Sequence, residues 1–456
     1  MIALSAAEIA EITGGVLAAE PGRAVSGDVH TDSRLVRPGD LFVAIVGESQ
    51  DGHAYIPQAL KAGATLVLSD REVAAPHVRV GDTVAALGAL AAAVLARLRD
   101  AGELTVVGIT GSAGKTTTKD LLGAILSAEA ETVWPEKSFN NDIGLPLTVL
   151  RAAPTTRYLV TEMGAAAEGE LTRLTFIAPL DVACVLMVGH AHVGGFGSIE
   201  DVARAKAELV ERVRPGGTVV LNGDDERVAA MAGHARHEDG SPVSDVRLFS
   251  ARRDAADLTL DELGRAHFTY QGIPVEVPIP GAHHVANALA ALTIAEALGV
   301  PGERAAAALG GAQLSAHRMD ITHRADGVTV LDDAYNANPE SMRAALISLA
   351  ALPARRRIAV LGAMLEMGEE ADGLHRDVGQ AAAEAGIDVV YSVGADPIAE
   401  GARAGGVPEV WAYAARTEAD AALAATLRSG DTVLFKGSNG TELWASAERL
   451  AAGERR

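Results

Sequence analysis

The segment GITGSAGKTTTK, residues 108–119, separates two different hydrophobic patterns. An apolar run typical of a buried strand precedes it at 104–107, and a helical pattern follows it at 120–126. At such a junction, glycines let the backbone approach an anion, the helix N-terminus presents free N–H groups, and a lysine adds positive charge. The segment therefore predicts a phosphate-binding loop, and the chain is expected to use a nucleoside triphosphate such as ATP.

The predicted loop departs from the strict P-loop pattern at one position. Where that pattern has glycine five residues before Gly114, the chain has Ile109. Lys115 and Thr116 keep the usual register, in which the lysine reaches the phosphates and the threonine hydroxyl binds Mg²⁺. A plain Gly/Thr turn would explain the glycines but not this register. The expected ATP-binding residues of the loop are Thr110, Gly111, Ser112, Ala113, Gly114, Lys115, Thr116 and Thr117.

Length and composition restrict the class of protein. The 456 residues predict about three domains. A formal net charge of −21, with no basic run longer than 355–357, argues against a nucleic-acid or anionic-membrane partner. A single cysteine, Cys184, excludes an internal disulfide. The N-terminus has no signal-peptide pattern and the most apolar stretch, 84–98, is short, so we expect a cytoplasmic protein without membrane insertion. We also expect a monomer.

The order of apolar runs predicts an α/β protein of three domains. Residues 1–80 contain short apolar runs among turn residues, as in a small α/β domain. In residues 81–314, strands alternate with helices around the phosphate loop, which predicts a doubly wound, mostly parallel sheet; within them, 257–280 indicates short hairpin strands. Residues 315–456 repeat the alternation and predict a Rossmann-like α/β domain.

Polar residues follow two of the predicted strands of the central domain. Glu162, in RYLVTEMGA, lies at the C-terminal end of a buried strand, where open α/β sheets bind their ligands. A carboxylate there can bind Mg²⁺, although it can also be an ordinary helix-capping residue. The loop GHAHVGGFGS carries His190 and His192. Such a glycine-rich loop lets a side chain reach a metal, but histidines in loops are more often solvated or structural.

Lys206 lies on the apolar side of a predicted helix. In IEDVARAKAELVERV it follows Val202 by four residues and precedes Val210 by four, so it shares their face. The common explanation is a lysine that snorkels to the surface. The alternative is that burial keeps the amine partly neutral, so that it captures CO₂ as a carbamate whose oxygens bind a second Mg²⁺. The spacing favours neither.

Further polar segments lie nearer the C-terminus. Asn287, in GAHHVANALAA, begins an alanine-rich helix and can contact an adenine edge, or it can simply cap the helix. Arg318 lies in HRMD, and a strand-like run leads into LDDAYNANPESM, residues 331–342. That loop can form one wall of a ligand-binding site, or its polar residues can simply stabilise a turn before a helix. Its polar residues are Asp332, Asp333, Asn336 and Asn338.

Five of these segments occur in an order that resembles the Mur ligase family: TGSAGKTTTK, TEMGA, AHVGGFGS, AKAE and HHVAN. Within that family, FNNDIGLPLTVL and DDAYNANPESM are similar to the member that adds D-alanyl-D-alanine, and the DNPR motif of the meso-diaminopimelate-adding member is absent from the sequence. The segment HTDSRLVRPGDLFVAIVGESQDGHAYI, residues 30–56, resembles the UDP-sugar-binding domain of these members.

The resemblance implies an ATP-dependent amide ligase of peptidoglycan precursor synthesis. It would join D-alanyl-D-alanine to the tripeptide carboxylate of UDP-N-acetylmuramoyl-tripeptide through an acyl phosphate, and release ADP and phosphate. Residues 1–80 would bind the UDP-sugar, residues 81–314 would bind ATP, and residues 315–456 would close over ATP and bind the dipeptide. A folylpolyglutamate synthase or another Mur ligase remains an alternative, and so does an ATP-binding switch without ligase activity.

The resemblance also implies roles for the residues described above. Lys115, His192 and Lys206 are the implied catalytic residues. Two Mg²⁺ ions are implied, one bound by Thr116 and Glu162 and the other by His192 and carbamylated Lys206. The implied adenosine contacts are Asn287, Arg318 and Asp333. The implied substrate contacts are Ser33 and Arg34 for the uridine nucleotide, Asn140 and Asn141 for the muramoyl-peptide, and Asn336 and Asn338 for the dipeptide.

At three places the chain departs from the usual family pattern. His284 stands where the family has asparagine before Val-x-Asn, so an amide is missing there. Val193 and Gly194 replace Leu and Glu in the AHLExFGS loop. Asn439 replaces the arginine of a KGSR-like motif, which removes a guanidinium able to bind a carboxylate or phosphate through two hydrogen bonds.

Overall fold

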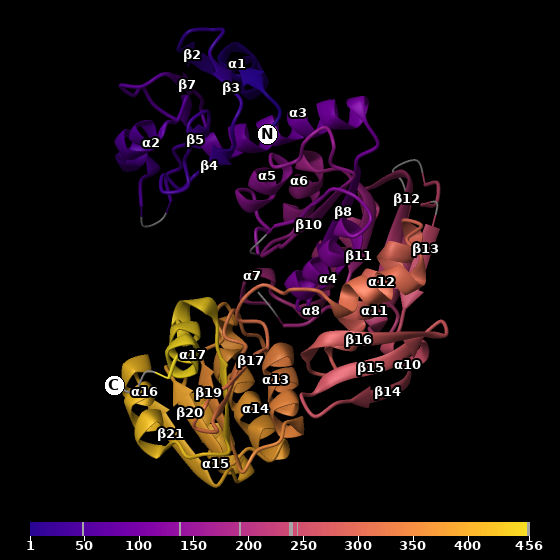
Figure 1. Ribbon diagram of the computed structural model, residues 1–456, viewed down its shortest axis with the longest axis vertical. Helices are drawn as coiled ribbons and strands as arrows, with labels where there is room; N and C mark the ends of the chain where they lie inside the picture. Colours follow the sequence, from indigo (N-terminus) through magenta and orange to yellow (C-terminus); the bar gives the residue numbers. More distant parts are fainter. Residues whose placement is uncertain (48–49, 136–137, 191–192, 237–239, 244, 454–456) are drawn as a thin grey trace.

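The computed structural model describes residues 1–456 apart from 48–49, 136–137, 191–192, 237–239, 244 and 454–456. The chain forms three α/β domains in sequence order, which follow one another from indigo through magenta to yellow in Figure 1. This arrangement confirms the predicted fold class. None of the helices formed by the described residues has both the length and the apolar character needed to span a bilayer.

The N-terminal domain is a small α/β unit. Its main sheet has the strand order β2-β7-β6-β5-β4, in which β4 to β7 pair in parallel and β2 is antiparallel. Leu41, Leu66 and Val78 are buried in its core. The elements are β1 (Leu4–Ser5), α1 (Ala6–Thr13), β2 (Val16–Ala18), β3 (Ala24–Val25), β4 (Val29–His30), β5 (Leu41–Val43), η1 (Gly52–Tyr55), α2 (Ile56–Ala62), β6 (Leu66–Ser69) and β7 (His77–Arg79).

The central domain is built on a parallel sheet with the strand order β13-β12-β11-β8-β10-β9. Strand β8 has β10 on one side and β11 on the other, so the order reverses around it, and ligands of open α/β sheets bind at such a reversal. The strands of this sheet are β8 (Thr105–Thr110), β9 (Thr132–Val133), β10 (Tyr158–Glu162), β11 (Leu180–Val185), β12 (Val213–Asn222) and β13 (Asp245–Phe249).

Helices cover both faces of the central sheet, because consecutive residues of its strands are apolar and point to opposite faces. Val106 of β8 packs in one core with α3, α6 and α8, whereas its neighbour Val107 packs in a second core with α4, α11 and α12. The helices are α3 (Thr83–Ala101), α4 (Lys115–Ser127), α5 (Gly144–Val149), α6 (Glu170–Ile177), α7 (Val193–Phe196), α8 (Ile199–Glu211), α9 (Glu226–Ala230), η2 (Met231–His234), α10 (Ala251–Asp254), α11 (His284–Ala297) and α12 (Gly302–Gly310).

A separate antiparallel sheet extends from the central domain at the side of α11 and α12. It consists of β14 (Ala256–Leu260), β15 (Arg265–Tyr270) and β16 (Ile273–Pro280). Phe268, Val275 and Val277 of this sheet share the core of α4 and α11. The prediction of hairpin strands within 257–280 is confirmed.

The C-terminal domain has the strand order β17-β18-β22-β19-β20-β21, and only the pairing of β17 with β18 is antiparallel among these described strands. Helices α13, α14 and α15 pack on one face, and α16 and α17 on the other. The elements are β17 (Asp320–His323), β18 (Thr329–Asp332), α13 (Pro339–Ala351), β19 (Arg356–Gly362), η3 (Gly368–Glu370), α14 (Ala371–Glu384), β20 (Val389–Val393), α15 (Asp396–Gly405), β21 (Glu409–Tyr413), α16 (Arg416–Thr426), β22 (Asp431–Lys436), η4 (Asn439–Thr441) and α17 (Leu443–Ala451).

A buried ion pair on α4 ties the central domain to the start of the C-terminal domain. Lys119 is fully buried, and its Nζ lies 2.5 Å from Asp120 Oδ1 and donates to the Pro135 carbonyl oxygen at 2.6 Å. Asp120 Oδ2 accepts from the backbone N–H of Ser315 at 2.8 Å. The pair therefore holds both the segment after β9 and the segment that leads to β17.

Asp120→Ala is expected to destabilise the protein, because it leaves the fully buried ammonium of Lys119 without its carboxylate. Removing one partner of a buried pair costs about 3–5 kcal/mol. Urea unfolding should show a lower midpoint for this variant. Glu400→Ala is the matched control: it breaks the exposed pair with Arg376 at 2.9 Å, and such pairs contribute about 0–1 kcal/mol. Equal midpoints for the two variants would contradict the structural role of Lys119 and Asp120.

Candidate active site

The phosphate loop connects β8 to α4, as predicted. Helix α4 begins at Lys115, earlier than the apolar pattern at 120–126 indicates, because its polar first turn belongs to the loop. Gly114 has φ +85°, and a Cβ added there would lie 2.3 Å from Asn287 Oδ1. Glycine is therefore required at Gly114 both for its backbone conformation and for the close approach of α11.

The side chain of Lys115 makes a hydrogen bond to the backbone of the phosphate loop itself. Its Nζ donates to the Gly111 carbonyl oxygen at 2.7 Å. Burial lowers the pKa of Lys115, and the nearby positive charge of Arg318 lowers it further, whereas Glu162 raises it. An anion in the loop would offset the cost of this buried positive charge, because it would replace solvent as the partner of the ammonium.

Glu162 is the centre of a buried group of oxygen and amide side chains. Its Oε2 accepts from Thr116 Oγ1 at 3.0 Å, and its Oε1 accepts from Ser138 Oγ at 2.6 Å and from Asn140 Nδ2 at 2.9 Å. Glu162 has no exposed surface. Carboxylate and hydroxyl oxygens are the ligands that Mg²⁺ prefers, so Thr116 and Glu162 have the chemistry required to bind this ion.

Arg318 reaches from the C-terminal domain to the phosphate loop. Its Nη2 donates to Thr116 Oγ1 at 3.0 Å, and its guanidinium carbon lies 4.3 Å from the centroid of the Tyr335 ring. Its neighbours His317 and Met319 both have positive φ, +61° and +59°. Non-glycine residues adopt this conformation only when the surrounding structure imposes it, and such strain is typical of functional sites.

The polar loop after β18 is anchored by Lys436 at the end of β22. Lys436 Nζ lies 2.5 Å from Asp333 Oδ2 and donates to the Asn336 carbonyl oxygen at 3.0 Å. Burial lowers the pKa of Lys436, and Asp333 opposes this effect. We did not identify Lys436 as a site residue from the sequence; a lysine at the end of the apolar run TVLF was the signal that could have indicated it.

Asn287 and His284 form a pair at the start of α11. Asn287 Nδ2 lies 3.0 Å from His284 Nδ1, and both residues are buried. His284 therefore uses one ring nitrogen to hold Asn287. Its Nε2 is buried and has no hydrogen-bond partner among the described residues. Burial lowers the pKa of His284 well below its usual value, so the ring is neutral.

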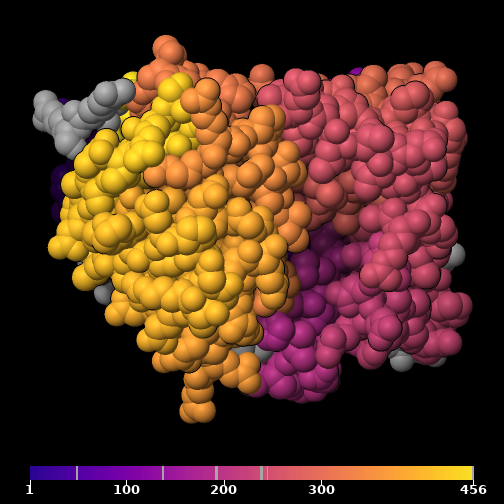
Figure 2. Space-filling view, turned by 90° about the horizontal axis from the view of Figure 1, so that it is seen from below, coloured from indigo at the N-terminus to yellow at the C-terminus, as the bar shows by residue number. Residues whose placement is uncertain are grey.

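A cleft of about 800 Å³ between the central and C-terminal domains brings most of the predicted residues together. Figure 2 looks into the seam between the yellow and orange C-terminal domain and the pink part of the central domain, with purple residues at its base. Predicted residues that line the cleft are Ser112, Ala113, Gly114, Lys115, Thr116, Thr117, Asn140, Asn141, Glu162, Asn287, Arg318, Asp333, Asn336 and Asn338.

Six predicted residues do not line the cleft or are not described. Thr110, the last residue of β8, and Gly111 come directly before the part of the phosphate loop that lines it. Ser33 and Arg34 belong to the N-terminal domain, where Arg34 is highly exposed and pairs with Asp32 at 2.6 Å. Lys206 lies on α8 and does not line the cleft, although it is close enough to Lys115 to interact with its charge. His192 lies outside the described residues.

Lys206 occupies the buried face of α8, as its spacing predicted. It is 3% exposed, and Val202 and Val210 on the same face are fully buried. Burial, helped by the charge of Lys115, lowers the pKa of Lys206 to about 7. The lysine does not snorkel, and a large fraction of its amine is neutral near pH 7.

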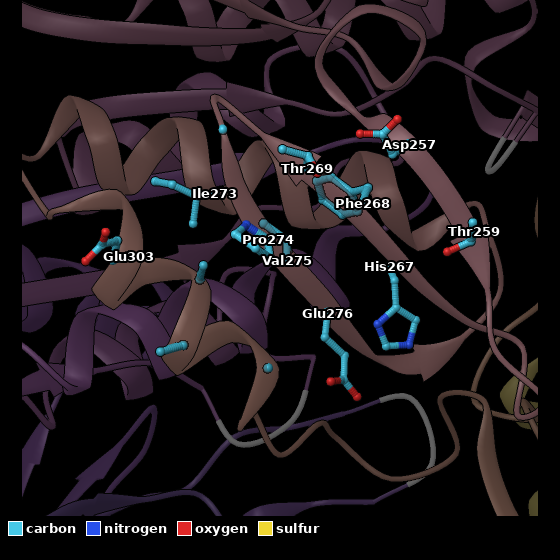
Figure 3. A pocket seen from close by; sticks show the side chains of 14 residues that line it. Asp257, Thr259, His267, Phe268, Thr269, Ile273, Pro274, Val275, Glu276 and Glu303 are labelled. Atoms are coloured by element: carbon cyan, nitrogen blue, oxygen red, sulfur yellow. The ribbon is translucent and has the colours of Figure 1, made fainter.

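A second cavity, of about 840 Å³, lies against the antiparallel sheet and α12. Figure 3 shows Asp257, Glu276 and Glu303 among the side chains around it, together with His267. None of the predicted site residues lines this cavity. Its lining residues include no lysine or arginine to bind phosphates, whereas Lys115, Arg318 and Lys436 line the cleft at the phosphate loop, which is therefore the candidate active site.

The fold and the cleft define a nucleotide-binding α/β protein whose phosphate loop faces a second α/β domain. Three stretches match models of one family: residues 18–95 the Mur ligase family catalytic domain, residues 109–295 the Mur ligase middle domain, and residues 317–439 the Mur ligase glutamate ligase domain. The chain belongs to the Mur ligase family.

Relatives with the name UDP-N-acetylmuramoyl-tripeptide–D-alanyl-D-alanine ligase cover the chain along its length. The one from Mycobacterium tuberculosis is 42% identical over 100% of this chain and 99% of its own. The one from Bacillus subtilis is 34% identical over 97% of each chain.

Solved structures of MurF are also similar. That from Acinetobacter baumannii has a TM-score of 0.85 and 31% identity over 99% of each chain. That from Thermotoga maritima, in complex with ADP, has a TM-score of 0.78 and 27% identity over 93% of this chain and 97% of its own.

The pKa of Lys206 predicts a pH-dependent stability. Between about pH 7 and 10.5 the unfolded chain binds a proton at this lysine that the folded chain does not, so stability rises with pH across this window. Below this pH window, the lysine is protonated in both states, and the stability of the folded protein is reduced by the full free-energy cost of a buried ammonium. Lys206→Met removes the penalty. The melting temperature of this variant is therefore expected to be higher than that of the wild type at about pH 6.5. At about pH 9.5 this difference in melting temperature should largely disappear.

Thermal melts of both proteins at the two pH values test this prediction. Lys61→Met, which removes an exposed lysine at the end of α2, is the control and should shift neither melt. An advantage of Lys206→Met that is equal at both pH values would mean that added packing, rather than the buried charge, causes it.

Proposed function

We propose that this chain is an ATP-dependent carboxylate–amine ligase of peptidoglycan precursor synthesis that acts in the cytoplasm. Its substrates are UDP-N-acetylmuramoyl-tripeptide and D-alanyl-D-alanine, and its other products are ADP and phosphate. One observation carries the proposal: the phosphate loop of the central domain and the polar loop of the C-terminal domain line the same cleft. The names of the full-length relatives support the choice of substrates.

In the first step, an oxygen of the tripeptide carboxylate attacks the γ-phosphorus of ATP. The new O–P bond gives an acyl phosphate, and the bond to the β-phosphate oxygen breaks to release ADP. Both reactants are anions, so positive groups must lie where they meet. Lys115 at the phosphate loop and Arg318 on Thr116 supply two such charges.

In the second step, the neutral amine of D-alanyl-D-alanine attacks the acyl carbon. A C–N bond forms, phosphate leaves, and a proton of the amine passes to the departing phosphate. Asn336 and Asn338 are the residues proposed for the dipeptide, and they lie in the same loop as Asp333, which is proposed for adenosine. Lys436 fixes this loop from the back, so it can orient the amine, and the domain that carries it can exclude water from the acyl phosphate.

Thr116 and Glu162 are the proposed ligands of one Mg²⁺. They fit the ion because both offer oxygen, lie 3.0 Å apart and are held by Ser138 and Asn140. When bound, Mg²⁺ would neutralise charge on the phosphates of ATP. Carbamylated Lys206, together with His192, is proposed for a second ion. The buried and partly neutral amine of Lys206 fits the addition of CO₂, which requires its free electron pair.

The remaining assignments of the sequence stay predictions. Residues 1–80 would bind the UDP-sugar through Ser33 and Arg34, residues 81–314 would bind ATP, and residues 315–456 would bind the dipeptide. Asn140 and Asn141 would lie along the muramoyl-peptide. In the structure Asn140 donates to Glu162, and Asn141 Oδ1 accepts from the Gly144 N–H at 2.9 Å at the start of α5.

Phosphate release by the purified protein tests the proposed function. The assay contains Mg²⁺-ATP, UDP-N-acetylmuramoyl-tripeptide and D-alanyl-D-alanine, and each is omitted in turn while the product mass is read. Release that needs all three, with a mass gain equal to the dipeptide less water, is the expected result. Release without the tripeptide would favour a nucleotide switch, and use of an amino acid in place of the dipeptide would favour another ligase.

Lys206→Ala is expected to lose most of the ligase activity, because it removes the proposed carbamate. Added bicarbonate should restore none of it, whereas a short carboxylate such as acetate should restore part, since it can occupy the space of the carbamate and supply its oxygens. Initial rates of phosphate release with and without each additive measure this. Full activity of Lys206→Ala would refute the carbamate.

A further inference from the structure

Helix α13 of the C-terminal domain begins against the phosphate loop. Its N-cap, Asn338, accepts a hydrogen bond from the Ser341 N–H at 2.8 Å and donates through Nδ2 to the Ser112 carbonyl oxygen at 3.1 Å. Asn338 is buried, and both ends of its amide are therefore used within the protein. The first turn of α13 is thus attached to the loop that binds phosphate.

Glu340, two residues further on, makes a second attachment. Its Oε1 lies 2.7 Å from His190 Nδ1 and accepts from the His190 backbone N–H at 3.1 Å. Among the ion pairs of the described residues, this is the one that joins residues 81–314 to residues 315–456. A Cβ on Gly189 would lie 2.7 Å from the Glu340 carboxyl carbon, so the carboxylate packs directly against this backbone.

The backbone that receives Glu340 is itself part of the phosphate-loop structure. Ser112 Oγ donates to the Gly189 carbonyl oxygen at 3.0 Å and accepts from the Gly189 N–H at 2.8 Å. Ser112 N–H also donates to the Met187 carbonyl oxygen at 2.9 Å. The phosphate loop, the segment after β11 and the start of α13 therefore form one hydrogen-bonded unit.

The charge of Glu340 is unfavourable where it lies. The residue lines the cleft that must bind ATP and a carboxylate, and its Oε2 is buried without a hydrogen-bond partner among the described residues. A negative charge beside anionic substrates weakens their binding, so its presence here calls for another role. Its contacts with His190 supply such a purpose, because they fix the C-terminal domain to the central one.

We propose that Glu340 is a positioning residue that latches the C-terminal domain closed through His190. The latch holds the loop 333–338, which directly precedes α13, over the phosphate loop. Glu340 touches no reacting atom. This inference rests on the proposed function, since the closed position matters because the dipeptide must meet the acyl phosphate before water does.

The test compares Glu340→Ala and Glu340→Gln with the wild type at one fixed pH. Glu340→Ala is expected to raise the KM for D-alanyl-D-alanine roughly tenfold or more, as loss of a charge-assisted hydrogen bond does. It should also release more phosphate than ligated product, because an open cleft admits water to the acyl phosphate. The affinity for ADP should not fall by more than about twofold, because no hydrogen bond joins Glu340 to the described loop residues 110–117 and loss of its negative charge does not weaken the binding of an anion. Glu340→Gln keeps an acceptor for the His190 N–H, so its KM and its excess release of phosphate should lie between those of the wild type and of Glu340→Ala.

Two controls separate the latch from a general loss of structure. Glu384→Ala removes an exposed carboxylate of the same domain, 3.9 Å from Arg343, and should behave as the wild type. In the double variant of His190→Ala and Glu340→Ala, the increase in KM should be smaller than the product of the single effects, because the two side chains act together.

Small-angle X-ray scattering with ADP provides a readout that does not need ligase activity. The wild type should be more compact than Glu340→Ala. The latch would be overturned if the wild type and Glu340→Ala had the same scattering, the same KM for the dipeptide and the same ratio of phosphate to product. It would also be overturned if the effects of the two single variants on KM multiplied fully in the double variant. If the wild type forms no ligated product, the proposed function fails instead, and scattering still decides whether Glu340 holds the domains together.

Discussion

The hydroxyl of Thr116 is the contact on which the arrangement of the active site depends. It donates to Glu162 at the end of β10 and accepts from Arg318 of the C-terminal domain. The first contact is possible because β8 and β10 are parallel neighbours, so both strands end at the same edge of the sheet. The second requires that the C-terminal domain is brought to this edge, which the buried pair of Lys119 and Asp120 achieves by holding Ser315.

Electrostatics explain how an acidic protein can bind acidic substrates. The net charge of the chain is −21, yet Lys115, Arg318 and Lys436 converge on one cleft. Burial lowers the pKa of Lys115 and Lys436, which means that their charged forms are poorly solvated. Bound phosphate and carboxylate groups would relieve that penalty. The three basic side chains thus offer local partners to anionic groups, in a cleft whose lining also includes Asp142, Glu162, Glu170, Asp333 and Glu340.

Much of the site could be predicted because its residues occur in local patterns. The glycines and Lys115 have a fixed spacing between a strand and a helix, and Glu162 ends an apolar run. Helical periodicity placed Lys206 on the buried face of α8, where the structure has it. Ser138, Lys436 and Glu340 were not identified, because each acquires its role from a partner far away in the chain: Glu162, Asp333 and His190 respectively.

By itself, the sequence determined the α/β class, the succession of three domains, the phosphate loop and the side chains that can carry its chemistry. Hydrophobic periodicity and short motifs depend on neighbouring residues, so they can be read along the chain. Only the tertiary structure decided which of these side chains share a cleft, that the amide of Asn338 is used by Ser112 and Ser341, and that Glu340 joins two domains. Those facts depend on strand order and domain packing, and hydrogen bonds between residues more than a hundred positions apart leave no local pattern in the sequence.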